Sequence, residues 1–196
     1  MKKSVFILSV FILAGIFIIS CNPKNDSPNA WHRSGSTLTY HLNDGSRAYD
    51  FIVSDLLLSE EISFSWKMTE PINSTGKVKI TNNAMENANK TVNYFADGSS
   101  QTMDNETTIW ISRKILKTCK AKEVTEIDLD GEIDSLTYKG NEKYKVKVDG
   151  KEQELDVLLL EGLNGNKLWV LDDDKYPLLI KMELQFTIEL LSVETK

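Results

Sequence analysis

Strict alternation of apolar and polar side chains is the feature that most restricts how this chain can fold. Apolar residues occupy every second position from residue 178 to residue 190, and residues 62–68 repeat the pattern. Because successive side chains of a strand point to opposite faces of a sheet, this alternation predicts half-buried strands. A single strand over 178–190 would measure roughly 40 Å, well above the usual five or six residues, so we expect it to bend. The apolar positions change parity at Leu191 and Val193, which predicts a β-bulge near Leu190 and Leu191.

Short turn signals separate the alternating segments. Five pairs of Asp or Asn followed by Gly occur, at Asp44-Gly45, Asp97-Gly98, Asp130-Gly131, Asp149-Gly150 and Asn164-Gly165. Such pairs favour hairpin turns with positive φ, so they indicate successive antiparallel strands. Helical signals are few: residues 112–120, with Ser112 as the N-cap, and residues 82–89. The sequence therefore predicts a mainly β fold, with a single curved antiparallel sheet (a half-barrel or open barrel) and one or two short helices.

The N-terminus has the three regions of a signal peptide. Lys2 and Lys3 are followed by an apolar run over residues 5–19, and the small residue Ser20 precedes Cys21. A membrane-spanning helix normally needs about 20 apolar residues, and this run is shorter. A retained anchor helix and an ordinary secretory signal with a chance cysteine remain as the alternatives.

Residues 18–21, "IISC", resemble the lipobox of bacterial lipoproteins. This resemblance implies that the Cys21 thiol receives a diacylglycerol, that residues 1–20 are removed, and that the acylated cysteine becomes the mature N-terminus. Two or more acyl chains hold a protein stably on a membrane. Asn22 follows the cysteine, which by the same resemblance implies passage to the outer membrane of a Gram-negative bacterium. Whether the protein faces the periplasm or the cell surface stays open.

The remaining chain divides into two parts. Residues 21–36 are polar and rich in Pro, Ser and Asn, interrupted by Trp31, and we expect a flexible tether there. Residues 37–196 are expected to form a single β-rich domain, with enough chain for one core. We expect this domain to be monomeric.

Charge and cysteine content exclude several classes of partner and site. The formal net charge is −6, which argues against nucleic acid as a partner and against a polybasic membrane patch. The lipid on Cys21 would then be the membrane attachment. Once Cys21 carries a lipid, Cys119 is the only thiol left in the chain, so we expect no intramolecular disulfide. We predict that the Cys119 thiol is buried and inert.

No motif indicates catalysis. The chain has two histidines, His32 and His41, and a Ser-His-Asp or Cys-His site in the domain would have to use His41. Three consecutive carboxylates at residues 172–174 have the oxygen ligands that a hard cation prefers, but a solvated turn before Pro177 is the favoured interpretation. We therefore expect no enzyme activity, no cofactor and no metal site.

The segment "NKLWVLDDDKYPLLIKMELQF" (residues 166–186) has an aromatic strand, an acidic turn, a proline and a long amphipathic strand. Over residues 104–196 the chain resembles the half-barrel family that includes the periplasmic lipoprotein carrier, its outer-membrane receptor and related uncharacterised lipoproteins. The resemblance implies a curved sheet with a helical lid and an apolar concave face that binds acyl chains. The residues we place on this face are Phe64, Trp66, Met68, Trp110, Trp169, Met182, Leu184 and Phe186. The alternative is that they fill a core.

Two function classes follow. In the first, the protein is a lipid-anchored, non-catalytic binding module for a hydrophobic small molecule, lipid or acyl chain. In the second, it is a structural or interaction lipoprotein with a filled core and its function in exposed loops. An unfilled interior cavity would distinguish the first from the second.

We predict that Cys21→Ser leaves an uncleaved and unlipidated precursor, because serine offers no thiol to receive the diacylglycerol. The measurement is the mass of the N-terminal peptide together with fractionation after carbonate washing. Maturation of the variant, with retention in the washed membranes, would contradict the lipoprotein interpretation.

Overall fold

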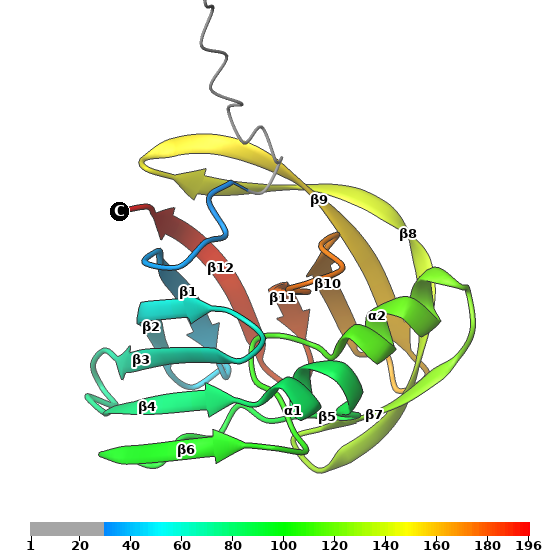
Figure 1. The fold of residues 1–196 in the computed structure, drawn as a ribbon, viewed down its shortest axis with the longest axis horizontal. Helices are drawn as coiled ribbons and strands as arrows, with labels where there is room; N and C mark the ends of the chain where they lie inside the picture. The colour runs from blue at the N-terminus through cyan, green and yellow to red at the C-terminus, as the bar shows by residue number, and fades with distance from the viewer. Residues whose placement is uncertain (1–29) are drawn as a thin grey trace, which may run out of the picture.

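One curved sheet forms the body of the molecule. The structure, a computed structural model, describes residues 30–196; Cys21, the signal peptide and residues 22–29 of the expected tether lie outside this part. The fold is mainly β as predicted, and its two short helices lie side by side at one edge of the sheet (Figure 1). In chain order the elements are β1 (Thr37–Asn43), β2 (Ala48–Leu58), β3 (Ile62–Met68), β4 (Thr75–Ile80), α1 (Asn82–Asn87), β5 (Lys90–Thr91), β6 (Ser99–Met103), α2 (Arg113–Lys120), β7 (Thr125–Leu129), β8 (Glu132–Val148), β9 (Lys151–Gly162), β10 (Lys167–Leu171), β11 (Leu179–Glu183) and β12 (Thr187–Glu194).

The sheet is mostly, but not wholly, antiparallel. Its order in the described residues is β5-β7-β8-β9-β10-β11-β12-β1-β2-β3-β4-β6. Three pairings are parallel, namely β4 with β6, β5 with β7, and the end of β8 with β12. The expectation of a purely antiparallel sheet is corrected at these places. Parallel neighbours need a long connection, and both β4–β6 and β5–β7 are separated by segments that contain a helix.

Four of the five predicted turn pairs connect antiparallel neighbours. Asp149-Gly150 joins β8 to β9, and both residues have positive φ (48° and 77°), as a two-residue hairpin turn requires. The three other hairpin pairs are Asp44-Gly45, Asp130-Gly131 and Asn164-Gly165. Asp97-Gly98 instead precedes β6, which runs parallel to β4, so this pair makes no hairpin.

The long strand predicted over residues 178–190 is wrong, because this segment is a hairpin. β11 pairs with β12 in antiparallel register, with Met182 opposite Ile188 and Glu183 opposite Thr187. Three residues lie between the last pair, so even-numbered residues of both strands face the same side. The apolar alternation therefore passes through the turn without a break and imitates one strand.

The predicted bulge is confirmed. Thr39 of β1 pairs with Ser192 of β12, whereas Tyr40 pairs with Leu190. Leu191 is the extra residue between them, and its side chain is 43% exposed. The bulge returns Val193 to the buried face, which explains the change of parity in the sequence.

The tip of the β8–β9 hairpin closes part of the sheet on itself. Lys147 and Val148 of β8 pair with Ser192 and Val193 of β12, so the five strands from β8 to β12 form a ring (Figure 1). The carboxylate of Asp149 accepts hydrogen bonds from the backbone N–H and the hydroxyl of Thr195, at 2.8 and 2.7 Å. These bonds hold the pKa of Asp149 below its ordinary value and fix the C-terminal strand against the hairpin tip.

A buried segment crosses the interior between β6 and α2. Residues 107–112 are all buried, and Trp110 has no exposed surface. Thr107 exchanges backbone hydrogen bonds with the β5 region, at 2.9 Å to Lys90 and 2.9 Å from Val92. Farther along, the carbonyl of Ile109 accepts from Leu179 N–H at 2.8 Å. The segment is thus bound to strands on two sides and occupies the space that a concave binding face would need.

The folded body begins before residue 37. Trp31 and His32 are 3% and 7% exposed, and the Ser36 hydroxyl donates to the Trp31 carbonyl at 2.7 Å. The His32 ring lies between Trp31 and Trp110, with ring centroids 5.4 and 6.3 Å away. The tether boundary predicted at residue 36 is therefore corrected: the large apolar surface of Trp31 is buried, and residues 31–36 belong to the domain.

Helix α2 matches its sequence signals. The Ser112 hydroxyl accepts from Ile115 N–H at the N-terminus, as expected of an N-cap. Cys119 is fully buried and makes no disulfide, and burial raises the pKa of its thiol to about 11. The predicted burial of this thiol is confirmed. Helix α1 has Thr81 as its N-cap.

We predict that Trp110→Ala lowers the free energy of unfolding by about 3–5 kcal/mol, because it leaves a cavity among the side chains of the crossing segment. The measurement is urea unfolding of the full chain. Leu163→Ala is the control: Leu163 is 82% exposed in the β9–β10 turn, so its loss should change stability by no more than about 0.5 kcal/mol. Equal effects of the two substitutions would contradict the packing described.

Candidate functional site

The eight residues predicted to form one apolar ligand face do not lie on one surface. Five of them are buried in the core: Phe64, Trp66, Met68, Trp110 and Met182. The rings of Phe64 and Trp110 pack against each other at 5.7 Å between centroids, as side chains of a filled core do.

The three remaining residues lie elsewhere. Trp169 is on the outer face of β10, where its indole N–H donates to Glu142 at 2.8 Å and Lys181 lies 4.9 Å from its ring centroid. Leu184 and Phe186 belong to the turn between β11 and β12. Only Phe186 of the eight lines the pocket described next.

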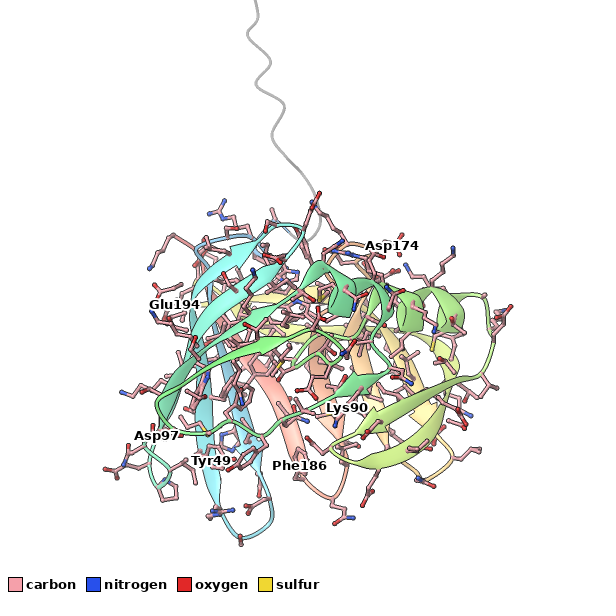
Figure 2. All side chains as sticks on the ribbon, turned by 60° about the horizontal axis from the view of Figure 1, so that its bottom comes forward. Tyr49, Lys90, Asp97, Asp174, Phe186 and Glu194 are labelled. Carbon is pink, nitrogen blue, oxygen red and sulfur yellow. The ribbon has the colours of Figure 1, made fainter. Side chains whose placement is uncertain are left out.

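A pocket of about 360 Å³ opens among the turns at one end of the sheet. Its walls come from the β1–β2 hairpin, the connection after β5, the β7–β8 turn and the β11–β12 turn. Tyr49 and Phe186 lie near each other at this end, below the helices in Figure 2. The lining residues are Leu42, Asn43, Asp44, Tyr49, Asn93, Tyr94, Asp130 and Phe186.

Three aromatic rings give the pocket its apolar surface. Tyr49 and Phe186 are half-buried, and partial burial raises the pKa of the Tyr49 hydroxyl. Tyr94 is 77% exposed and is the one aromatic residue among the large exposed hydrophobic side chains of residues 30–196. The Tyr94 ring contributes little to the packing of the fold and is available to a ligand at the edge of the pocket.

Asp44 is already saturated with hydrogen bonds. It accepts from the backbone N–H groups of Ser46 and Arg47, from the Ser46 hydroxyl, and from the Arg47 guanidinium at 3.0 and 2.8 Å. The Ser46 hydroxyl and the Arg47 N–H hold the pKa of this carboxyl well below its usual range. Since an ionised carboxylate accepts about four hydrogen bonds, Asp44 builds the turn and has no capacity left for a ligand.

Asp130 retains capacity for a ligand. One of its oxygens accepts from the Asn93 backbone N–H at 2.7 Å and the other from the Asn93 side-chain amide at 2.8 Å, which leaves about two acceptor positions. The side-chain carbonyl of Asn93 is enclosed and has no hydrogen-bond partner. The Asn43 side chain accepts from Gly45 N–H, and its amide group makes no hydrogen bond in the described part of the chain.

The pocket lies at the end of the sheet opposite the N-terminal segment. β1 begins with Thr37 opposite Glu194 and ends with Asn43 opposite Thr187, next to the pocket. Over its seven residues this strand carries the chain roughly 20 Å from one end to the other. Figure 2 shows Glu194 well separated from Tyr49 and Phe186.

The acidic run at residues 172–174 has structural partners. Lys120 of α2 binds Asp172 at 2.5 Å and Asp174 at 2.6 Å, while Asp173 accepts from the backbone N–H groups of Lys175 and Tyr176. Within residues 30–196 no group of three or more His, Cys, Asp or Glu side chains is placed to hold a metal ion.

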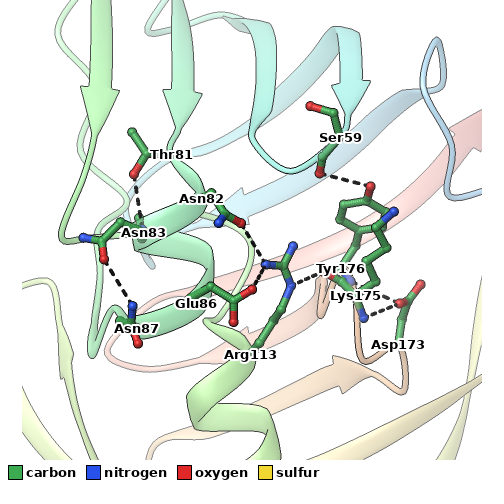
Figure 3. Close-up of polar contacts among 11 residues, drawn as sticks. Ser59, Thr81, Asn82, Asn83, Glu86, Asn87, Arg113, Asp173, Lys175 and Tyr176 are labelled. Atoms are coloured by element: carbon green, nitrogen blue, oxygen red, sulfur yellow. Dashed lines mark hydrogen bonds and ion pairs between the residues drawn. The ribbon is translucent and has the colours of Figure 1, made fainter.

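A second polar cluster joins the two helices to the same turn. Arg113 of α2 binds Glu86 of α1 at 2.6 Å and the Asn82 side chain at 3.3 Å, and its Nε–H donates to the Lys175 carbonyl at 2.9 Å (Figure 3). Tyr176 donates its hydroxyl proton to the Ser59 carbonyl at 3.1 Å. Through its Nε and Nη1 groups, Arg113 thus joins both helices to this turn.

His41 does not belong to a nucleophilic site. Its ring pairs with Asp50 at 2.9 Å on the outer surface of β1 and β2. No Ser or Cys side chain of the described residues is hydrogen-bonded to His41. The arrangement therefore lacks the nucleophile that such a pair would activate.

Comparison with known proteins adds no relative: no protein-family model, no curated protein and no solved structure matches this chain. Neither of the helices in residues 30–196 is both long enough and apolar enough to cross a membrane.

Sequence reasoning missed most of this site, because its residues come from the β1–β2 hairpin and from three connections far apart in the chain. Asp44 and Asp130 were recognised as turn residues, and Phe186 as part of an alternating strand. The available signal for Tyr94 was an aromatic residue in the segment NYFADG (residues 93–98), which ends in the Asp97-Gly98 turn pair.

We predict that Tyr94→Ala changes the free energy of unfolding by no more than about 0.5 kcal/mol, since the side chain is exposed. The adjacent Phe95→Ala is the matched comparison. Phe95 is 9% exposed and packs between the rings of Phe51 and Trp66, at 5.0 and 5.1 Å, so its loss should cost about 3–5 kcal/mol. The free energy of unfolding of both variants is measured by chemical denaturation. A large decrease for Tyr94→Ala would assign this ring a structural role.

Proposed function

We propose that the protein is a lipid-anchored, non-catalytic binding module of the outer membrane in a Gram-negative bacterium, and that it holds its ligand in the pocket among the turns. The observation that carries the proposal is the exposed Tyr94 ring, together with Tyr49 and Phe186, around a pocket that retains hydrogen-bonding capacity. Anchoring is proposed through a diacylglycerol on Cys21, on the lipobox sequence alone. The domain acts as a monomer in this proposal.

The position of the pocket supports this arrangement. The chain enters the domain at the end where Trp31, the β8–β9 tip and Thr195 line the same surface hollow. β1 then leads to the opposite end, where the pocket opens. A module attached to a membrane through its N-terminus would therefore present the pocket away from the attachment point.

The filled interior favours turn-based binding over storage of an acyl chain between the strands. Trp110 and the crossing segment occupy the concave side, and they are held there by backbone hydrogen bonds as well as packing. The same observation supports the second candidate, an interaction lipoprotein whose loops contact a macromolecule. The two proposals differ in whether a small molecule enters the pocket by itself.

The proposal is tested by saturation-transfer NMR on the full-length protein in detergent, with a library of neutral, cationic, anionic and apolar fragments. We expect fragments whose signal is lost with Tyr94→Ala and kept with Leu163→Ala, an equally exposed side chain outside the pocket. A dansyl-labelled fatty acid serves as the interior probe. Fatty-acid binding that disappears with Trp66→Ala but not with Tyr94→Ala would overturn the proposal, and so would a library without any Tyr94-dependent hit.

A further inference from the structure

We infer that the ligand of this pocket is a neutral sugar residue. The inference rests on the proposed binding function and adds the chemical class of the ligand. Four properties of the pocket carry it: its charge, its remaining hydrogen-bonding groups, its aromatic rings and its size.

The charges of the pocket select against anions. Asp44 is paired with Arg47 at 2.8 Å, so its charge is compensated within the turn. Among residues 30–196 the Asp130 carboxylate is bonded only to the neutral Asn93, at 2.7 and 2.8 Å, and its uncompensated charge would repel an anionic group such as a phosphate or a uronic acid. The same carboxylate is a strong hydrogen-bond acceptor for a neutral ligand that carries hydroxyl groups.

The hydrogen-bonding groups that remain are of both kinds. Asp130 can accept further hydrogen bonds, and the Asn43 amide can donate. The hydroxyls of Tyr49 and Tyr94 can do either. Vicinal hydroxyls of a sugar ring each donate and accept, so they match such a mixed set. A fatty acid or an aliphatic ligand would leave these groups without partners.

The aromatic rings match the other side of a sugar. A pyranose ring carries C–H groups on its faces, and these polarised hydrogens are attracted to the negative face of an aromatic ring. Tyr49 lies in β2, Tyr94 in the connection after β5 and Phe186 in the β11–β12 turn, so they can contact a ring from more than one direction. The exposed Tyr94 offers a surface on which a neighbouring sugar unit could continue outward.

The size of the pocket limits the ligand. About 360 Å³ lies near the lower end of the range for ligand pockets, roughly 300–1,000 Å³. This volume suits one sugar ring better than an extended acyl chain. The pocket therefore holds a single unit, with any further units outside it.

The test is binding of the full-length, detergent-solubilised protein to an array of neutral oligosaccharides built from hexoses, deoxyhexoses and N-acetylhexosamines. Affinity for the best oligosaccharide is then measured by calorimetry for the wild type and three variants. We expect at least a tenfold loss for Tyr94→Ala and a smaller loss for Tyr94→Phe, which keeps the ring but lacks the hydroxyl. Leu163→Ala lies outside the pocket and should retain binding. Because the ligand is neutral, affinity should also be unchanged between 0.05 and roughly 0.5 M salt, across which charge–charge attraction is strongly screened.

The outcomes separate this inference from the proposed function. If no neutral oligosaccharide binds while a cationic or apolar fragment still binds in a Tyr94-dependent way, the sugar inference is overturned and the binding function stands. Sugar binding that survives Tyr94→Ala would remove the sugar from this pocket. If neither the array nor the fragment library yields a Tyr94-dependent ligand, both the inference and the proposed function fail.

Discussion

The backbone hydrogen bonds of the crossing segment are the constraint on which the rest of the structure depends. Residues 107–112 lie in the interior, where an unpaired N–H or C=O is costly. Thr107 finds its partners beside β5, and Ile109 and Ile111 find theirs at residues 177–179. This segment therefore joins β5, at the edge of the sheet, to the start of the β11–β12 hairpin. It also places Trp110 in the core. A strongly curved sheet becomes a filled body because one of its own connections occupies it.

The filled interior decides where a ligand can bind. Phe64 packs on Trp110, and Trp66 packs on Phe51 and Phe95, so the interior is filled. Surface for recognition is left at the ends of the strands, where connections from distant parts of the chain meet. The turns are rigid because their polar side chains bond to their own backbone: Asp44 closes the β1–β2 turn, and Asp130 holds Asn93. The same bonds that stabilise the connections also determine which acceptors remain for a ligand.

Much of the fold could be predicted from local patterns, and the failures have definite physical causes. Asp-Gly pairs mark hairpins because the turn itself demands positive φ, and the bulge at Leu191 is visible as a change of parity. The β11–β12 turn was missed because residues 184–186, Leu-Gln-Phe, include no Gly, Pro or Asn and leave the alternation intact. The parallel pairings and the pocket depend on where long connections return, which no local pattern specifies. Trp31 was noticed only as an interruption of a polar segment, although its burial extends the domain.

The path of β1 has a mechanical consequence. Its hydrogen bonds to β2 and β12 lie across the strand, and the strand itself runs from the N-terminal end of the domain to the pocket. A force applied between residue 31 and an object held at the pocket would act along β1 and load both rows of bonds in shear. Bonds loaded in this way must yield together, whereas bonds pulled open from one end yield one after another. The direction in which the domain would resist being torn apart is thus the direction that joins its point of entry to its pocket.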